Sequence, residues 1–376
     1  MSGSENPEAR TLSRRDFLRS SAAAGGTLAT ASLLGETVAA AQGRDHIVIN
    51  GLDTSDVDEG FLEQLRAAAV TCSHVSIGGP YNYGPLLRFI DSHPKETMLV
   101  RAGADILNAR REGKVGFVSG AQSADYMQTL LTDVVATKNT RVGEALRTLY
   151  ELGLRTQGIC YNVASIFGGG CLQPGIALTN VGERLVEEVH KLRIVLDVGG
   201  HTGEQTSLDA IAMSSGVPVV CTHTNVAALN PNPRATSNRV LEAIAATGGV
   251  IGVTAVSDFH LRNAATAREG PHSPRATLER HLDEYDYLKK LVGVNHVGLG
   301  PDFVGAWVHN HDSTDNTYFP AEVLGDGIPQ YVQGFESISQ LRNVEQGLAL
   351  RGWTQAELDK LMGGNWLRVY EKVWGR

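Results

Sequence analysis

Short runs of apolar residues alternate with amphipathic stretches from residue 46 to the end of the chain. Each apolar run is nearly uniform along its length, as expected for strands of a parallel sheet that is covered on both faces. The stretches between them have the spacing of amphipathic helices, for example at 181–192 and 239–247. The apolar runs lie at residues 46–50, 70–77, 115–119, 156–160, 194–198, 217–221, 250–253 and 296–299, with a further candidate at 98–101.

Eight strand–helix units favour an α/β fold of the (β/α)8 barrel type over an open, doubly wound sheet. No GxGxxG pattern follows the first apolar run, which weakens a dinucleotide-binding interpretation. No repeat or linker divides the chain, so we expect one barrel domain over residues 42–376. A polar region at 304–327 is predicted to be a long loop, and it carries His309, His311 and Asp312. Three helices are predicted to close the chain, at 334–351, 354–362 and 365–373.

The net charge of the chain bears on which kinds of molecule it could bind. The chain has 376 residues, with 33 Lys and Arg against 41 Asp and Glu, which gives a net charge of −8. This acidic balance argues against nucleic acid or an anionic membrane as the main partner. The four cysteines are irregularly spaced and match no zinc-finger or redox pattern, so we expect them to be small buried residues.

The first 41 residues have the layout of an export signal. Adjacent Arg14 and Arg15 precede Phe-Leu, a mildly apolar stretch follows at 22–34, and a small-residue cleavage site ends at Ala41. The paired arginines predict the twin-arginine route, and therefore a periplasmic or extracellular location. The stretch is too short for a stable membrane span, so we expect a mature protein that is soluble and spans no membrane.

Polar residues gather where the predicted strands end, which is where a barrel carries its chemistry. Two histidines and an aspartate at such ends, His201, His223 and Asp302, have the residue types of a zinc site. With 12 histidines in the chain, spacing alone leaves a metal site and chance placement both open. Further strand-end candidates are Gln122, Tyr161 and Asn162, of which Asn162 is a candidate substrate contact.

Several segments, in order along the chain, resemble the renal (membrane) dipeptidase family. The resemblance runs from about residue 46 to the C-terminus and implies a (β/α)8 barrel. It is carried by the segments 113–118 (GKVGFV), 149–155 (LYELGLR), 196–206 (LDVGGHTGEQT), 218–225 (PVVCTHTN), 245–253 (AATGGVIGV), 291–303 (LVGVNHVGLGPDF) and 363–369 (GGNWLRV).

The family resemblance implies a set of site residues. Members of this family hydrolyse dipeptides with two zinc ions, which a first-strand His-x-Asp, a bridging Glu and two later histidines hold. Carried over by position, the two histidines are His201 and His223. A substrate-contacting Arg falls on Arg234, and a substrate-contacting Asp falls on Asp302. The resemblance also makes a homodimer the expected assembly.

The sequence departs from this ligand pattern. The His-x-Asp positions fall on Leu52 and Thr54, with Asp53 between them and expected to point elsewhere on a strand of period two. The bridging Glu becomes Gln122, and a substrate-contacting His becomes Tyr161. Two divalent ions held close together repel and rely on an anionic bridge, which a neutral amide cannot supply.

We therefore predict at most one zinc ion, and no bound metal remains an alternative. The predicted ligands of a single ion are His201, His223 and Gln122, with water or Asp302 completing the set.

Three functions stay open on the sequence. The first is an exported metallohydrolase that cleaves a dipeptide or related amide, with Asp302 as the general base or substrate-amine contact and Arg234 binding a carboxylate. The second is a non-hydrolytic isomerase or tautomerase in which Tyr161 and Asp302 are the acid–base pair. The third is a ligand-binding protein on the same barrel, since a fold does not fix a function.

Overall fold

The computed structural model describes residues 46–128, 138–267, 274–304, 319–325 and 329–375. The predicted export signal and most of the predicted loop at 304–327 lie outside these residues. The strands are β1 (Ile49–Asp53), β2 (Cys72–Ser76), β3 (Thr97–Leu99), β4 (Val115–Ala121), β5 (Leu154–Gly158), β6 (Val195–Asp197), β7 (Cys221–Thr224), β8 (Ile251–Val253) and β9 (Val297–Leu299).

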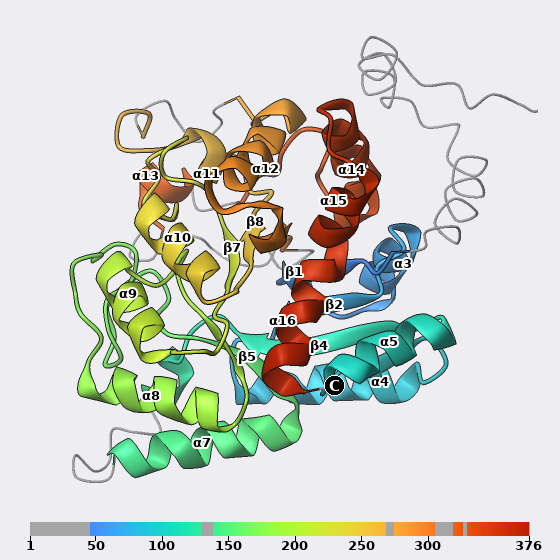
Figure 1. The fold of residues 1–376 in the computed structure, drawn as a ribbon. Coiled ribbons are helices and arrows are strands. Elements are labelled where there is room, and N and C mark those ends of the chain that lie inside the picture. The colour runs from blue at the N-terminus through green and yellow to red at the C-terminus, as the bar shows by residue number, and fades with distance from the viewer. Residues whose placement is uncertain (1–45, 129–137, 268–273, 305–318, 326–328, 376) are drawn as a thin grey trace, which may run out of the picture.

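Helices follow most strands and cover the outside of the sheet (Figure 1). The helices are α3 (Glu59–Ala67), α4 (Tyr83–Ser92), α5 (Gly103–Glu112), α7 (Lys138–Leu152), α8 (Asn180–Lys191), α9 (Glu204–Met213), α10 (Asn238–Ala246), α11 (Ser257–Leu261), α12 (Leu278–Val292), α13 (Ala321–Leu324), α14 (Leu341–Leu350), α15 (Gln355–Asp359) and α16 (Asn365–Trp374).

All the paired strands run parallel, in the order β1-β2-β4-β5-β6 and β7-β8-β9. Strand β3 is outside this order and pairs with β4. A parallel bridge between Asp197 and Val220 joins β6 to β7. The ring closes where Thr54 N donates to the Phe303 carbonyl at 2.8 Å and Asp302 N donates to the Leu52 carbonyl at 3.2 Å. The predicted (β/α)8 barrel is confirmed, and the additional apolar run at 98–101 corresponds to β3 outside the ring.

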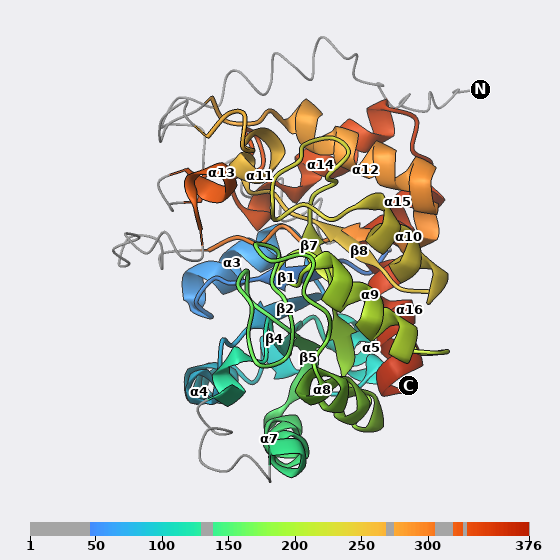
Figure 2. The ribbon, with the colours of Figure 1, turned by 90° about the vertical axis from the view of Figure 1, so that its left-hand side faces the viewer.

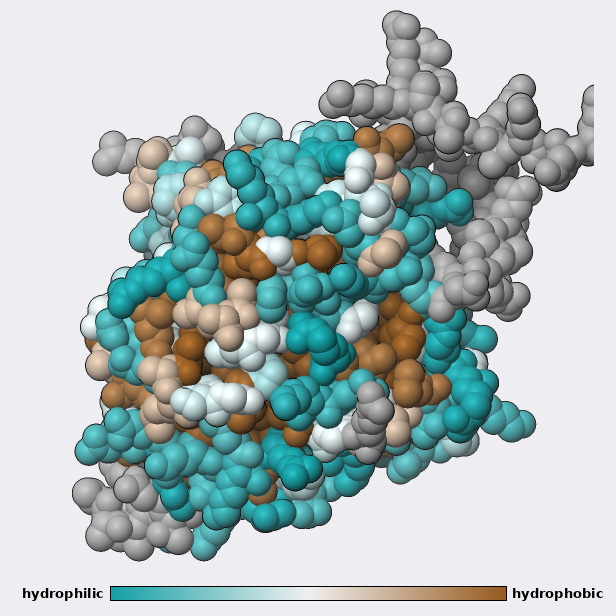
Figure 3. All heavy atoms as spheres, viewed as in Figure 1, coloured by the Kyte–Doolittle hydropathy of each residue, from teal (hydrophilic) through white to brown (hydrophobic). Residues whose placement is uncertain are grey.

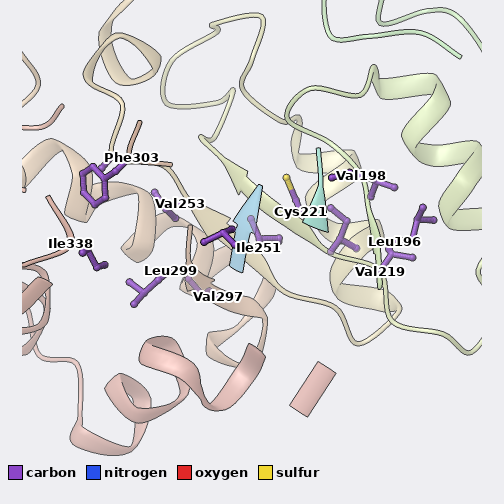
Figure 4. Close-up of a cluster of buried hydrophobic side chains, with 14 of the residues drawn as sticks. Leu196, Val198, Val219, Cys221, Ile251, Val253, Val297, Leu299, Phe303 and Ile338 are labelled. Carbon is purple, nitrogen blue, oxygen red and sulfur yellow. The ribbon is translucent and has the colours of Figure 1, made fainter. Parts of the chain in front are cut away.

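Alternate residues of the strands face two different cores. Leu196, Ile251, Val253 and Leu299 belong to the core that lies between the strands and the outer helices (Figure 4). A second set fills the inside of the barrel and packs against Trp366, Val369 and Tyr370 of α16, and consists of Ile49, Cys72, Val118, Val195, Val220 and Val250.

Helix α16 closes one end of the barrel and leaves the other for the site. Trp366 is fully buried, and its indole Nε1 donates to the Leu299 carbonyl at 3.0 Å. A Cβ atom at Gly51 or Gly298 would lie about 2.5 Å from the Trp366 ring, so both glycines are needed for this close packing. Figure 2 shows α16 on one side of the strands and α11 and α13 on the other.

The surface carries few large exposed apolar side chains. On the face shown in Figure 3, hydrophobic residues appear in small groups among hydrophilic ones. Such scattered exposure is normal, and the expected homodimer stays a prediction. No helix among the described residues has the length and apolar character needed to span a membrane. All four cysteines are buried and unpaired, as predicted.

Candidate functional site

A cavity of about 840 Å³ opens where the strands end, opposite α16. Its lining includes four of the predicted site residues, Gln122, Tyr161, His201 and Asp302. The other three, Asn162, His223 and Arg234, are almost fully buried and lie outside this lining. The structure therefore divides the predicted residues into a set that faces the cavity and a set that lies behind it.

His201 lies in the cavity wall, where one ring contact and two polar contacts hold its imidazole. Gly199 and Gly200, at φ +76° and +55°, bring the chain from β6 to His201 through a left-handed turn. The imidazole stacks on the ring of Tyr161, with centroids 4.0 Å apart. Its Nδ1 lies 2.6 Å from Asn162 Oδ1, and its Nε2 lies 3.3 Å from Arg234 Nη2.

The contact with Arg234 fixes the tautomer of His201. A guanidinium only donates hydrogen bonds, so the lone pair of His201 Nε2 must accept from Nη2. The ring proton is therefore on Nδ1, which donates to the carboxamide oxygen of Asn162. Burial, followed by the charge of Arg234 and then by His223, lowers the pKa of His201 well below 6.5, so the ring is neutral.

His223 is fixed in the same way from the other side. Asp197 accepts hydrogen bonds from Thr222 N at 2.8 Å and from Thr222 Oγ1 at 2.6 Å. Because the Thr222 hydroxyl proton is used there, Oγ1 accepts from His223 Nδ1 at 2.8 Å. His223 Nε2 is buried, has no hydrogen-bond partner among the described residues, and lies 4.0 Å from Asp302 Oδ2.

Asp302 carries the carboxyl group nearest to His223 Nε2. Its backbone has φ +60°, an uncommon conformation for a residue other than glycine and one that is found at functional sites. Burial raises the pKa of Asp302 to about 7, where the charge of Arg234 lowers it and that of Asp53 raises it. A carboxyl group with this pKa can both accept and donate a proton near neutral pH.

Asp53 is not among the residues that line the cavity, and its predicted orientation away from the site stays a prediction. The pairing of β1 with β2 is irregular between Asn50 and Asp53, where three steps along β1 match two along β2. This bulge interrupts the period-two alternation of side chains along β1. Asp53 is fully buried, accepts from Asn50 Nδ2 at 3.0 Å, and acts electrostatically on Asp302. Burial raises its pKa to about 6.

Arg234 is a buried cation without a carboxylate partner. It is 1% exposed, forms no ion pair among the described residues, and its Nε and Nη1 have no hydrogen-bond partner there. Its guanidinium lies 5.1 Å from the ring centre of Phe259, which lines the cavity together with His201. These unused N–H groups are available to pair with an anion.

The two histidines are supported alike at Nδ1 but differ at Nε2. Each donates its Nδ1–H to a protein group, which is how metal-binding histidines are usually supported. Among the described residues, His223 Nε2 has no partner, whereas His201 Nε2 accepts from Arg234. At the end of β1, however, Leu52 is apolar and Thr54 Oγ1 donates to the Phe303 carbonyl at 2.9 Å. Across the described residues, no three His, Cys, Asp or Glu side chains form a group that could hold a metal ion.

Sequence reasoning missed His74, which lies in the middle of β2. It is buried, its Nδ1 donates to the Gly51 carbonyl at 2.8 Å, and its electrostatic effect reaches His223. A Cβ atom at Gly120 would lie 1.9 Å from His74 Nε2, so this glycine makes room for the imidazole. The inward positions of β2 could have identified His74, because it is two residues after Cys72.

A second buried network supports the chain just after His223. Glu284 of α12 accepts from Val226 N at 2.8 Å and lies 3.4 Å from His260 Nδ1. His260 Nε2 is 3.3 Å from His281 Nδ1. Burial, followed by His260, lowers the pKa of His281 well below 6.5, so this ring stays neutral in the folded chain.

We expect the stability of the protein to fall as the pH drops below about 6.5, with His281 as one cause. The unfolded chain binds a proton at His281 near its ordinary pKa, and the folded chain does not, which disfavours the folded state by up to about 1.4 kcal/mol per pH unit. Urea unfolding at pH 7.5 and 5.5 should show a smaller pH dependence for His281→Gln than for the wild type. Equal pH dependence in the two proteins would contradict this assignment.

Comparison with known proteins places the chain in a family. Residues 85–324 and 321–374 match the model of membrane dipeptidase, peptidase family M19. An uncharacterised protein from the pqqA 5′ region of Klebsiella pneumoniae is 34% identical over 241 residues, which is 62% of this chain and 77% of that protein. An uncharacterised dipeptidase of Schizosaccharomyces pombe is 26% identical over 76% of this chain, and the match spans 60% of its own length.

A solved structure agrees with these matches. An amidohydrolase from Pseudomonas aeruginosa is 25% identical to this chain and superposes with a TM-score of 0.74. The match covers 91% of this chain and 99% of that protein. The predicted resemblance is confirmed, and the chain belongs to the membrane dipeptidase family, peptidase family M19, as a dipeptidase-like metallohydrolase.

Proposed function

We propose that this chain is an exported hydrolase that cleaves a dipeptide, or a related amide with a free carboxylate, and binds one zinc ion at most. The observation that carries the proposal is Arg234, a buried cation with unused N–H groups directly behind the cavity wall. Export rests on the paired arginines and the small-residue cleavage site, in residues that the structure does not describe.

Different residues around the cavity would have different roles in such a reaction. The unused N–H groups of Arg234 would pair with the substrate carboxylate and orient the substrate. Asp302, with its pKa near 7, would move the proton between the attacking water and the leaving amine. The aromatic ring of Tyr161 covers one face of His201 and keeps water from it.

A single metal ion would be held by His223, with His201 as a further ligand once its Nε2 is released from Arg234. His223 Nε2 is the open donor, Asp302 is the nearest carboxylate, and Gln122 faces the same cavity with a neutral amide. When bound, zinc would polarise the scissile carbonyl and activate a water molecule.

A dipeptide assay with and without zinc tests the proposal. We expect turnover that a strong chelator abolishes and zinc restores, and that His223→Ala lowers by at least about 100-fold, because it removes the open donor. His296→Ala is the matched control, since His296 precedes β9 at the far end of the barrel and should keep wild-type activity. No turnover above that of His223→Ala would contradict the proposal.

The isomerase or tautomerase interpretation keeps one supporting observation. Tyr161 and Asp302 both line the cavity, and the charge of Asp302 acts on the Tyr161 hydroxyl, so an acid–base pair without a metal is available. This alternative predicts conversion of a substrate without hydrolysis, at a rate that a strong chelator leaves unchanged.

A further inference from the structure

The atom with which His201 would bind a metal ion is already engaged. Its Nε2 lone pair accepts a hydrogen bond from Arg234 Nη2 at 3.3 Å, while Nδ1 is used by Asn162. An imidazole has one lone pair in its neutral form, so His201 cannot bind the guanidinium and an ion at the same time. His223 differs, because its Nε2 has no partner among the described residues.

The position of the guanidinium depends on the chain beside it. A Cβ atom at Gly200 would lie 2.7 Å from Arg234 Nη1, so only glycine at this position lets the guanidinium come so close. The backbone N of Arg234 is anchored on Asn232 Oδ1 at 2.8 Å. The positive charge is thereby placed on the side of His201 from which an ion would approach, and like charges in a buried site repel strongly.

We propose that Arg234 and the metal ion compete for His201 Nε2, and that the substrate carboxylate decides between them. Without a carboxylate, Arg234 stays on His201, and the donors left to an ion among the described residues are His223 and Asp302. A carboxylate that pairs with Arg234 draws the guanidinium away and frees His201 as a further ligand. This inference rests on the single-ion site of the proposed function.

Arg234 lies directly behind residues of the cavity wall, and it is 1% exposed. His201 and Phe259 both line the cavity, and the guanidinium contacts both of them from behind. Its Nε and Nη1 are free of hydrogen bonds among the described residues, so a carboxylate gains contacts there that the protein does not supply. Because coupling between two ligands is reciprocal, the carboxylate must tighten metal binding by the same factor by which the metal tightens carboxylate binding.

Zinc affinity, measured by competition with a chromophoric chelator, tests the competition directly. Arg234→Met removes the charge and keeps an unbranched side chain, and we expect zinc to bind at least tenfold more tightly than to the wild type. Arg234→Gln is a second uncharged variant, and thermal unfolding checks that each variant is folded. Adding His201→Ala to Arg234→Met should remove the gain.

The carboxylate effect needs its own pair of probes. With N-acetylglycine present, we expect zinc binding to the wild type to tighten at least fivefold, whereas Arg234→Met should not respond. The matched neutral compound, N-acetylglycinamide, should change neither protein, which separates the carboxylate from the rest of the molecule.

The outcomes separate this inference from the proposed function. Equal and tight zinc binding by the wild type and by both Arg234 variants would overturn the competition and leave the single-ion site in place. Absence of zinc binding in all three proteins would overturn both. A response to N-acetylglycine that persists in Arg234→Met would also overturn the competition.

Discussion

Replacing Asp302 with asparagine is expected to lower kcat/KM for dipeptide hydrolysis about 100- to 10,000-fold, because it removes a proton-transferring group. The substitution keeps the size and shape of the side chain and the strained backbone at φ +60°, so its effect is on the chemistry. Burial gives this carboxyl a pKa of about 7, which no amide can reproduce.

Asp56→Asn is the matched control for this prediction. Asp56 also lines the cavity, but it is exposed at the rim and lies apart from the two histidines. Its replacement should change kcat/KM by less than about threefold, since exposed charges interact weakly. Steady-state kinetics on both variants, with circular dichroism to check folding, decide the point. Wild-type activity in Asp302→Asn would remove this residue from the reaction.

Replacing Trp366 with alanine is expected to have the largest effect on stability, about 3–5 kcal/mol. The side chain is fully buried at the closed end of the barrel, and the absence of a Cβ at Gly51 and Gly298 leaves room for its ring. Its loss leaves a cavity and an unpaired Leu299 carbonyl. These contacts involve backbone of β1 and β9, so neighbouring groups cannot easily move into the space.

Urea unfolding of Trp366→Ala and Trp366→Phe separates the two contributions. Phenylalanine fills part of the space but cannot donate to Leu299, so its cost should lie between zero and that of alanine. The exposed Leu350→Ala is the control and should change the free energy of unfolding by less than about 0.5 kcal/mol. A cost below about 1 kcal/mol for Trp366→Ala would mean that α16 does not hold this end of the barrel.

Much of the barrel could be predicted because several of its strands lie in short runs of apolar residues that supply both cores. The runs at 194–198 and 250–253 are examples, since Leu196 and Ile251 belong to the outer core and Val195 and Val250 to the inner one. The predicted boundaries differ by a few residues where a strand ends in polar side chains. β1, for instance, extends to Asp53, because hydrogen bonds to neighbouring strands continue past the apolar run.

The site was predictable only where the strand ends carry distinctive residues. His201, His223 and Asp302 do lie together, because parallel strands bring their C-terminal ends to one face of the barrel. The contact of Arg234 with His201 could not be predicted, since the loop geometry around Gly200 sets it. The metal ligands and the roles of Asn162 and Gln122 stay predictions.

The bulge in β1 has a consequence for how such chains are compared. Three steps from Asn50 to Asp53 match two steps along β2, so residues after the bulge change face relative to β2 without any substitution. Matching letters in a sequence alignment therefore do not establish matching chemistry in this strand. Two relatives with identical residues here, one with the bulge and one without, would present different groups to the same substrate.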